Sequence, residues 1–521
     1  MQLTVPQKTD ADASSFPVDP DGVNRWLSKL NPINSVNDAM EVYRGLRHSN
    51  RLNNDLNRRR DVVACLIPTL RDLCDALQEI CQAQPLPLTS EFQRSAQLLD
   101  GLLREEALAF KIMLAESPQP RGNDLRRAMQ ALARQAECRV HCYKKPSEPL
   151  LRDAHQLYGL AEEFSLLDAK PEDEQRSTFD HYRYILLMTL ADCRQHRVGQ
   201  LQPMLEFLRA HASGIRLTKQ MPADLARVGT FAFHLNDGAK PVPATALLTE
   251  GTRDVRWFNV TPLLTRIDAQ LANANAQDSA LLGSETLDRQ SFARLRVTFA
   301  RSRARRTQRR ITFEAKLVTI GHKSICAHMH LAAAKAASAA AEISADNLAA
   351  GYEALNKASD IPTLENDDDW VLDNQSAQGA CLHNTNCRAG SVQVGELISV
   401  QALDAARTTG PSGRSQALLG IVRWVAASDS NGITLGMEFL AKGVLPVGLS
   451  RSNSTDIIAD DALIVACKVQ NKILQTILLP AYLYQSNDRL IVTLNGKSRH
   501  VMLSQQLQHN GLFSHFSLRD V

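Results

Sequence analysis

The spacing of apolar residues changes partway along the chain, and this change limits the folds that the chain can adopt. Before about residue 220, apolar residues recur at three- and four-residue steps, as in Val63, Leu66, Leu70, Leu73 and Leu77. After about residue 310, apolar and polar residues alternate, which is the period of a strand with one buried face. The sequence therefore predicts a multidomain α + β protein, with a helical N-terminal half and a β-rich C-terminal half.

Breaks in the helical pattern indicate how the first half is organised. Prolines interrupt the apolar periodicity at Pro85, Pro118 and Pro146. Antiparallel helices joined by short loops would produce this pattern, so a helical bundle is expected. The alternative is a helical-repeat scaffold, but no motif recurs at a fixed period, which favours the bundle.

A basic segment and an insertion mark the start of the β-rich half. The segment from Arg301 to Arg310 holds six arginines within a stretch of ten residues and follows an amphipathic helical pattern. Alternation then begins at Ile311 and stops at Gly321. Residues at about 330–369 are first rich in alanine, the best helix former, and then acidic. They are interpreted as an insertion between two β segments.

Further strand-like segments follow the insertion. They cover residues 370–373, 392–400, 418–425 and 433–439, with a turn signal at residues 431–432. Strands in this order, with short turns between them, predict a small closed antiparallel barrel. The tail from about residue 455 is β-rich again and is expected to form a small C-terminal β module.

These shifts in pattern predict five regions. They are a disordered N-terminus over residues 1–20, a helical domain over 21–220, a small mixed module over 221–284, a β-barrel with a basic lead-in helix and an alanine-rich insertion over 285–450, and a C-terminal β module over 451–521.

Composition excludes several classes of protein. The formal net charge is only +3, so overall charge predicts no nucleic-acid or membrane partner. The N-terminus lacks the apolar core of a secretory signal, and no run reaches the roughly 18 apolar residues that span a bilayer. A soluble, cytoplasmic protein without a membrane span is expected. The ten cysteines are scattered and are expected to be reduced core thiols.

The sequence carries no motif that predicts catalysis, a metal or a cofactor. Phosphate-binding loops, dinucleotide-binding glycine patterns and the common hydrolase signatures are all missing. Cys138, His141 and Cys142 cluster, but no second pair with zinc-ligand spacing lies near them. His383 and Cys387 lack a visible third group that would orient a nucleophile pair. The chain is therefore not expected to be an enzyme. Cys326, His328 and His330 are expected to lie on a strand.

Two short segments carry a recognisable pattern on either side of the insertion. In the arginine-rich segment, Arg305 with Arg309 and Arg306 with Arg310 both fit R-x-x-x-R. After the insertion, Asn374, Ser376 and Gly379 fill the positions of (D/N)-x-S-x-x-G. In this order, and with strands around both, the two motifs resemble the signature of the PilZ-domain family of cyclic di-GMP receptors. The resemblance covers roughly residues 300–450, and the helical first half is similar to that of long proteins that end in a PilZ domain.

The resemblance implies a β-barrel that binds cyclic di-GMP through Arg305, Arg306, Arg309, Arg310, Asn374, Ser376 and Gly379. The chemistry of these residues suits that ligand. An arginine fork binds a phosphate bidentately or faces a guanine edge, and an asparagine amide pairs with a base. Ser376 is expected to stabilise the turn or reach the ligand, and Gly379 to allow a positive φ and a close backbone approach.

The expected function is a receptor that converts binding of cyclic di-GMP into altered contact with an unidentified protein partner. The family resemblance implies an output in motility, pili or biofilm formation. Two alternatives remain open. One is a PilZ-like scaffold that binds no ligand and only contacts proteins. The second, less expected, is a nucleic-acid-binding module that uses the arginine run on phosphates, which predicts a steep salt dependence without preference for a cyclic dinucleotide.

Overall fold

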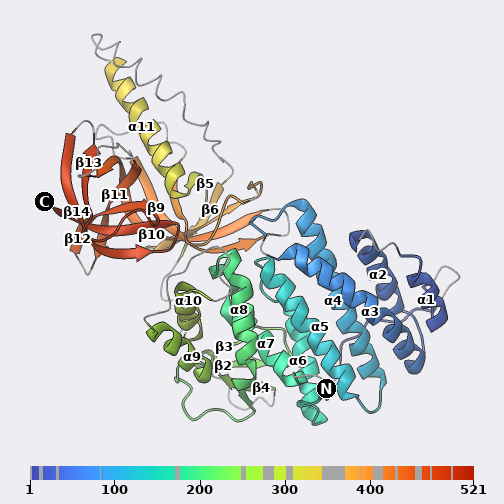
Figure 1. The fold of residues 1–521 in the computed structure, drawn as a ribbon. Coiled ribbons are helices and arrows are strands. Elements are labelled where there is room, and N and C mark those ends of the chain that lie inside the picture. Colours follow the sequence, from blue (N-terminus) through green and yellow to red (C-terminus); the bar gives the residue numbers. More distant parts are fainter. Residues whose placement is uncertain are drawn as a thin grey trace. The chain divides into compact units, whose positions relative to one another are not determined.

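The computed structural model describes fifteen stretches of the chain. These are residues 3–10, 16–30, 35–82, 84–170, 176–247, 254–273, 287–300, 309–342, 370–388, 390–402, 415–428, 432–451, 460–469, 472–494 and 497–521. The chain divides into two compact units (Figure 1). One comprises Met1–Gln84 and Leu88–Arg305, and the other comprises Pro85–Pro87 and Arg306–Val521. Each unit is described by itself.

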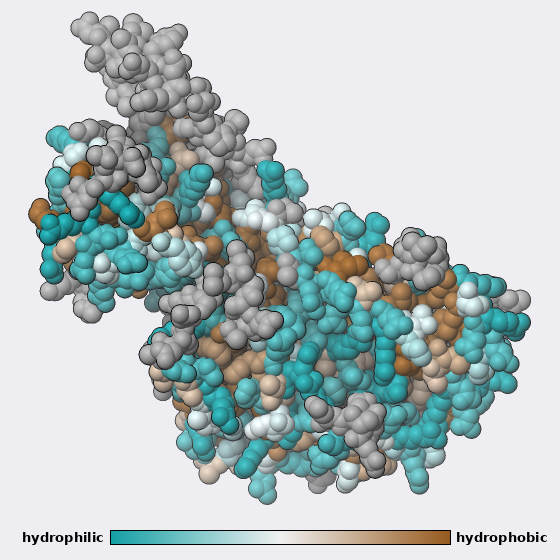
Figure 2. Space-filling view, in the orientation of Figure 1, coloured by the Kyte–Doolittle hydropathy of each residue, from teal (hydrophilic) through white to brown (hydrophobic). Residues whose placement is uncertain are grey.

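Helices dominate the first unit, as the periodicity predicts. They are α1 (Pro20–Leu27), α2 (Ser35–Ser49), α3 (Leu56–Cys81), α4 (Ser90–Glu116), α5 (Gly122–His141), α6 (Glu148–Glu163), α7 (Thr178–Ala191), α8 (Val198–His211), α9 (Thr261–Ala272) and α10 (Arg289–Phe299). Helix α5 packs against α4, α6, α7 and α8, so it lies at the centre of this unit. Hydrophilic residues cover much of the face of this unit seen in Figure 2, as expected for helices that bury one side.

Local chemistry sets where several helices begin. Asp55 accepts hydrogen bonds from the first backbone N–H groups of α3. Ser177 and Asp180 form a reciprocal capping box at the start of α7. Such caps satisfy backbone donors that have no partner inside the helix.

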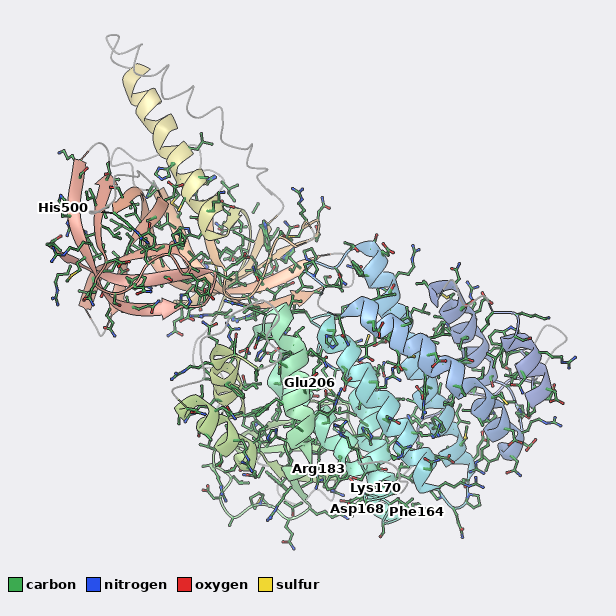
Figure 3. All side chains as sticks on the ribbon, viewed as in Figure 1. Phe164, Asp168, Lys170, Arg183, Glu206 and His500 are labelled. Carbon is green, nitrogen blue, oxygen red and sulfur yellow. The ribbon has the colours of Figure 1, made fainter. Side chains whose placement is uncertain are left out.

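The loop after α6 carries Phe164, Asp168 and Lys170 (Figure 3).

A small sheet packs onto these helices. Its strands are β1 (Arg216–Thr218), β2 (Thr230–His234), β3 (Val242–Pro243) and β4 (Val255–Asn259), in the order β1-β4-β2-β3. Buried Arg256 on β4 forms an ion pair with Glu162 on α6. The ring of His155 on α6 stacks on Phe233 of β2 with centroids 4.8 Å apart. Polar and aromatic contacts thus attach this sheet to α6.

Buried histidines should make the helical unit sensitive to acid. Burial lowers the pKa of His141, His155 and His181 to about 4, and that of His196 to about 3. The unfolded chain therefore binds more protons than the folded chain below about pH 6.5, so stability is full above that pH and falls as the pH drops toward 4. Burial raises the pKa of Glu106 to about 7, which opposes one of the four histidines.

We therefore expect the melting temperature, measured from the helical signal in circular dichroism, to decrease when the pH is lowered from 7.5 to 5. The cost approaches roughly 1.4 kcal/mol per pH unit for each histidine that is not offset. An unchanged midpoint over this range would contradict the burial of these rings in neutral form.

The second unit contains two six-stranded antiparallel barrels that share one strand. The strands are β5 (Arg310–Ile320), β6 (Trp370–Gln375), β7 (Gly379–Asn384), β8 (Leu397–Ala402), β9 (Ser415–Ala427), β10 (Ile433–Arg451), β11 (Asp460–Val469), β12 (Lys472–Pro480), β13 (Arg489–Leu494), β14 (Lys497–His509) and β15 (Phe513–Asp520). The first barrel closes in the order β5-β6-β7-β10-β9-β8, and the second in the order β10-β11-β12-β15-β14-β13. The expected fold class, a helical half followed by an antiparallel barrel and a further β module, is confirmed.

Strand β10 is long enough to serve both barrels. Its 19 residues pair first with β7 and β9 and then with β11 and β13. The switch falls at Val444, which pairs with Ser415 of β9 and Val465 of β11. The boundary expected near residue 450 therefore falls within a strand that both barrels share, and the domain bounds themselves stay predictions.

The start of the insertion is a helix that packs onto the barrels. Gly321 adopts a positive φ of 91° and turns the chain from β5 into α11 (His322–Glu342). Ile325, Cys326 and Met329 are buried in one core with residues of both barrels. The expectation that Cys326, His328 and His330 lie on a strand is wrong, because the glycine turn ends the strand and the helical period takes over. Residues 343–369 lie outside the described residues.

Candidate functional site

The two motif segments meet by direct strand pairing. Strand β5 begins at Arg310 and runs antiparallel to β6. Arg310 lies opposite Gln375, and Ile311 lies opposite Asn374. The insertion therefore does not keep the end of the arginine segment away from Asn374. Arg305 and Arg306, the other members of the two registers, lie outside the described residues.

An irregularity in β6 decides which way Asn374 points. Trp370 and Leu372 are buried, so strict alternation would carry Asn374 to the same face. Between Leu372 and Asn374, however, β6 contains one residue more than β7, which is a β-bulge at Asp373. The bulge places Asn374 on the other face. The Asp373 carboxylate lies 2.5 Å from Nδ1 of His383, which anchors the extra residue.

Ser376 stabilises the turn between β6 and β7. Its backbone N–H donates to the carbonyl of Gly379 at 2.8 Å. Its hydroxyl donates to the same carbonyl and accepts a hydrogen bond from the backbone N–H of Gln378. These contacts are typical of a serine-initiated turn and hold the loop beside Asn374. Of the two roles expected for Ser376, the structure shows the first.

Gly379 occupies a position that no side chain could share. A Cβ atom there would lie 2.2 Å from the carbonyl oxygen of Met437 on β10. The backbone of β10 therefore lies close against Gly379, and the approach of a ligand to this residue stays a prediction. Its φ is not positive, so the left-handed conformation also expected for Gly379 is not found.

Two adjoining cavities lie over this turn. The smaller, of about 140 Å³, is lined by Arg309, Asn374, Ser376 and Gly379 together with residues of β9 and β10. The wider and more open one, of about 480 Å³, is lined by Arg309, Arg310, Gln375, Ser376 and Ala377. We call the two together the β5–β6 groove. Its wider part falls within the roughly 300–1,000 Å³ typical of small-molecule sites.

The residues of β9 and β10 that line this groove were not predicted from the sequence. Arg423 and Trp424 on β9, with Gly436, Met437 and Glu438 on β10, line the smaller cavity. The Trp424 indole lies across Gly436, where a Cβ atom would approach its Nε1 to 2.0 Å. The strand pattern at residues 418–425 predicts the strand. It carries no signal that a residue there faces the turn at Gly379.

The groove has an excess of positive charge. Arg423 forms an ion pair with Glu438 at 2.6 Å, so one of the lining arginines is neutralised. Among the described residues, no carboxylate forms an ion pair with Arg309 or Arg310, and both are exposed. Two available guanidinium groups beside an amide and a serine turn suit a small ligand that carries phosphates and polar ring edges.

The other candidate clusters do not form sites. No group of three or more metal-ligating side chains occurs in the described part of the chain, which includes Cys138, His141 and Cys142. His383 contacts Asp373, while the sulfur of Cys387 lies 2.9 Å from the hydroxyl of Ser391. These two side chains thus have different partners rather than each other.

Comparisons with known proteins point to one family. Residues 21–223 match the family model described as the cyclic-di-GMP receptor FimW, N-terminal domain. The whole chain aligns with the cyclic-di-GMP receptor FimW of Pseudomonas aeruginosa at 22% identity over 591 aligned positions, which covers 100% of this chain and 93% of the relative. No solved structure matches the chain. The described helices include none with the length and apolar character needed to cross a membrane. The predicted relationship to a cyclic-di-GMP receptor family is confirmed.

Proposed function

We propose that this chain, a distant member of the cyclic-di-GMP receptor FimW family, is itself a receptor that binds cyclic di-GMP in the β5–β6 groove. The observation that carries this proposal is the pairing of Ile311 with Asn374, which joins the arginine segment to the serine turn. The groove that results offers guanidinium groups, an amide and backbone polar groups together. The relative's name supports the same ligand.

Each residue has a distinct role in this proposal. Arg309 lines both cavities and holds a phosphate or a guanine edge with its planar fork. Asn374, turned outward by the bulge, pairs with a base edge. Ser376 and Gly379 act through the backbone, by shaping the turn and by permitting close packing. Trp424 provides a flat apolar wall at the inner end.

The position of Arg309 favours one of the two registers. Only Arg309 of the two described arginines lines the cavity that also contains Asn374 and Gly379. Arg310 contributes to the wider cavity alone. Arg309 therefore belongs to the inner part of the groove and Arg310 to its mouth, which favours the register of Arg305 with Arg309 for binding the ligand.

A receptor of this kind acts by changing what the protein contacts. Binding of phosphates by the arginines of the groove would alter how the chain engages a protein partner. An output in motility, pili or biofilm formation follows from the family resemblance. The name of the aligned relative, a receptor, supports a binding role rather than catalysis.

Calorimetric titration of the full chain with cyclic di-GMP tests the proposal. GTP and a short DNA duplex serve as controls. Micromolar or tighter binding of the cyclic dinucleotide alone is expected, because only that ligand offers two phosphodiesters and two guanine edges in a compact ring. Duplex binding with a steep salt dependence would favour the nucleic-acid alternative instead. If neither cyclic di-GMP, GTP nor the duplex binds, the result favours the alternative of a scaffold that binds no ligand.

Variants at one position connect the measured binding to the groove. Asn374→Ala should weaken binding by about 1–3 kcal/mol, since it removes a polar partner from a desolvated contact. Gln506→Ala, at an exposed amide on β14 in the other barrel, should leave the affinity unchanged. Equal effects of the two substitutions would place the ligand elsewhere.

A further inference from the structure

The first half of β5 exposes two large apolar side chains beside each other. Ile311 is 72% exposed and Phe313 is 78% exposed, the two highest values among the exposed large apolar residues of the described chain. Isolated apolar residues on a surface are ordinary. Ile311 and Phe313 are separated by a single residue on the same strand, and we call this pair the apolar ridge. Water solvates such a pair poorly, so this segment favours contact with another surface.

The same segment is also a strand edge. Residues from Lys316 to Ile320 pair with β8 on one side, through registers from Lys316 opposite Ala402 to Ile320 opposite Ile398. Arg310, Ile311, Glu314 and Ala315 pair with β6, with a register irregularity between Ile311 and Glu314. Among the described strands, none pairs with the other side of residues 310–315. A strand edge presents backbone N–H and C=O groups in a row, and such a row accepts a further strand.

The sequence of this edge is complementary to itself. If two copies pair antiparallel about Thr312, Arg310 of each copy lies opposite Glu314 of the other. In the same register, Ile311 of each copy lies opposite Phe313 of the other. Glu314 forms an ion pair with Lys316 on the same strand, yet its side chain remains 57% exposed and accessible to a second cation, and Arg310 is exposed as well. Opposite charges and pairs of aromatic with β-branched residues are both favourable across antiparallel strands.

We propose that this edge is a dimer interface, at which β5 of one copy extends the first barrel of a second copy. The contact is isologous, since each copy supplies the same residues, and it closes as a two-fold dimer. It extends the sheet and covers both apolar ridges at once. It also lies directly beside the β5–β6 groove, because Arg310 lines the mouth of that groove.

Charge reversal in separate copies tests the pairing register. Arg310→Glu alone should strongly weaken the dimer, because glutamate would face Glu314 twice. Glu314→Arg alone should do the same, because arginine would face Arg310 twice. An equimolar mixture of the two variants should restore it, because in the mixed dimer both pairs again have opposite charges. Sedimentation of the full chain, with no nucleotide added, measures the species.

The wild-type chain is expected to sediment at twice the mass of one chain at micromolar concentration. Each single variant should dimerise at least about tenfold more weakly, and the mixture should recover the wild-type value. Lys497→Glu, a charge reversal at an exposed residue of β14, should leave the dimer unchanged. Phe313→Ser should also weaken it, and circular dichroism of this variant checks that the fold is intact. A wild-type monomer, a Glu314→Arg dimer or a monomeric mixture would each overturn the proposal. Because no ligand is present, none of these outcomes depends on the proposed function.

Discussion

Replacing Arg309 by alanine is expected to lower the affinity for cyclic di-GMP by about 100-fold, the largest effect of any single change in the groove. Arg309 is the described arginine that lines both cavities. A bidentate pair with a phosphate comprises two charge-assisted hydrogen bonds, and their loss costs about 3 kcal/mol. Calorimetry with the full chain measures the change.

Two matched variants test whether the planar guanidinium of Arg309 is required, rather than its charge alone, and whether Arg309 matters more than the adjacent Arg310. Arg309→Lys keeps the charge but loses the planar fork, so it should recover only part of the affinity. Arg310→Ala should weaken binding less than Arg309→Ala does, because Arg310 lines only the wider cavity. If Arg310→Ala proves the more damaging of the two, the opposite register binds the ligand.

Gly379→Ala should damage both the first barrel and its ligand site. A Cβ atom at this position would lie 2.2 Å from the Met437 carbonyl oxygen, so β7 and β10 would have to separate. Overpacking of this kind typically costs about 1–3 kcal/mol, and here the obstacle is backbone that cannot rotate away. Denaturant unfolding measures the lost stability, and a cyclic di-GMP titration of the folded variant measures the lost binding.

Gly448 supplies the matched control for this substitution. It lies on the same long strand β10, yet a Cβ atom there would meet nothing within 4 Å. Gly448→Ala should therefore leave binding unchanged, and it should raise stability slightly because it restricts the unfolded chain. If Gly379→Ala unfolds no more easily than Gly448→Ala, the close approach of β7 to β10 is not what position 379 requires.

The position of α11 bears on how a signal could leave the groove. Strand β5 starts at the groove with Arg310 and ends at Ile320, and after Gly321 the chain enters α11 at His322. Residues Ile325, Cys326 and Met329 of α11 pack into a core that contains residues of both barrels. A change at the arginine segment is thus connected by one strand and one helix to the second barrel. The proposed dimer edge occupies the same strand.

The sequence alone determined the fold class and the two motif segments. Helical and strand periods are written in the local order of apolar residues, so the helices of the first half and the strands near Ile311, Trp370 and Ile433 could be predicted. The turn at Ser376 could be predicted for the same reason, since its hydrogen bonds involve neighbours within three residues. A local sequence pattern thus predicts the helix, strand or turn that its own residues form.

Only the tertiary structure decided which groups face one another. The bulge at Asp373 turns Asn374 outward, and its anchor is His383, ten residues away on another strand. Trp424 and Gly436 reach the groove because β9 pairs with β10, and β10 joins two barrels because it continues past Val444. Such features depend on register between distant segments, and a shift of one residue moves every side chain to the other face. The spacing of residues along a chain does not contain that register.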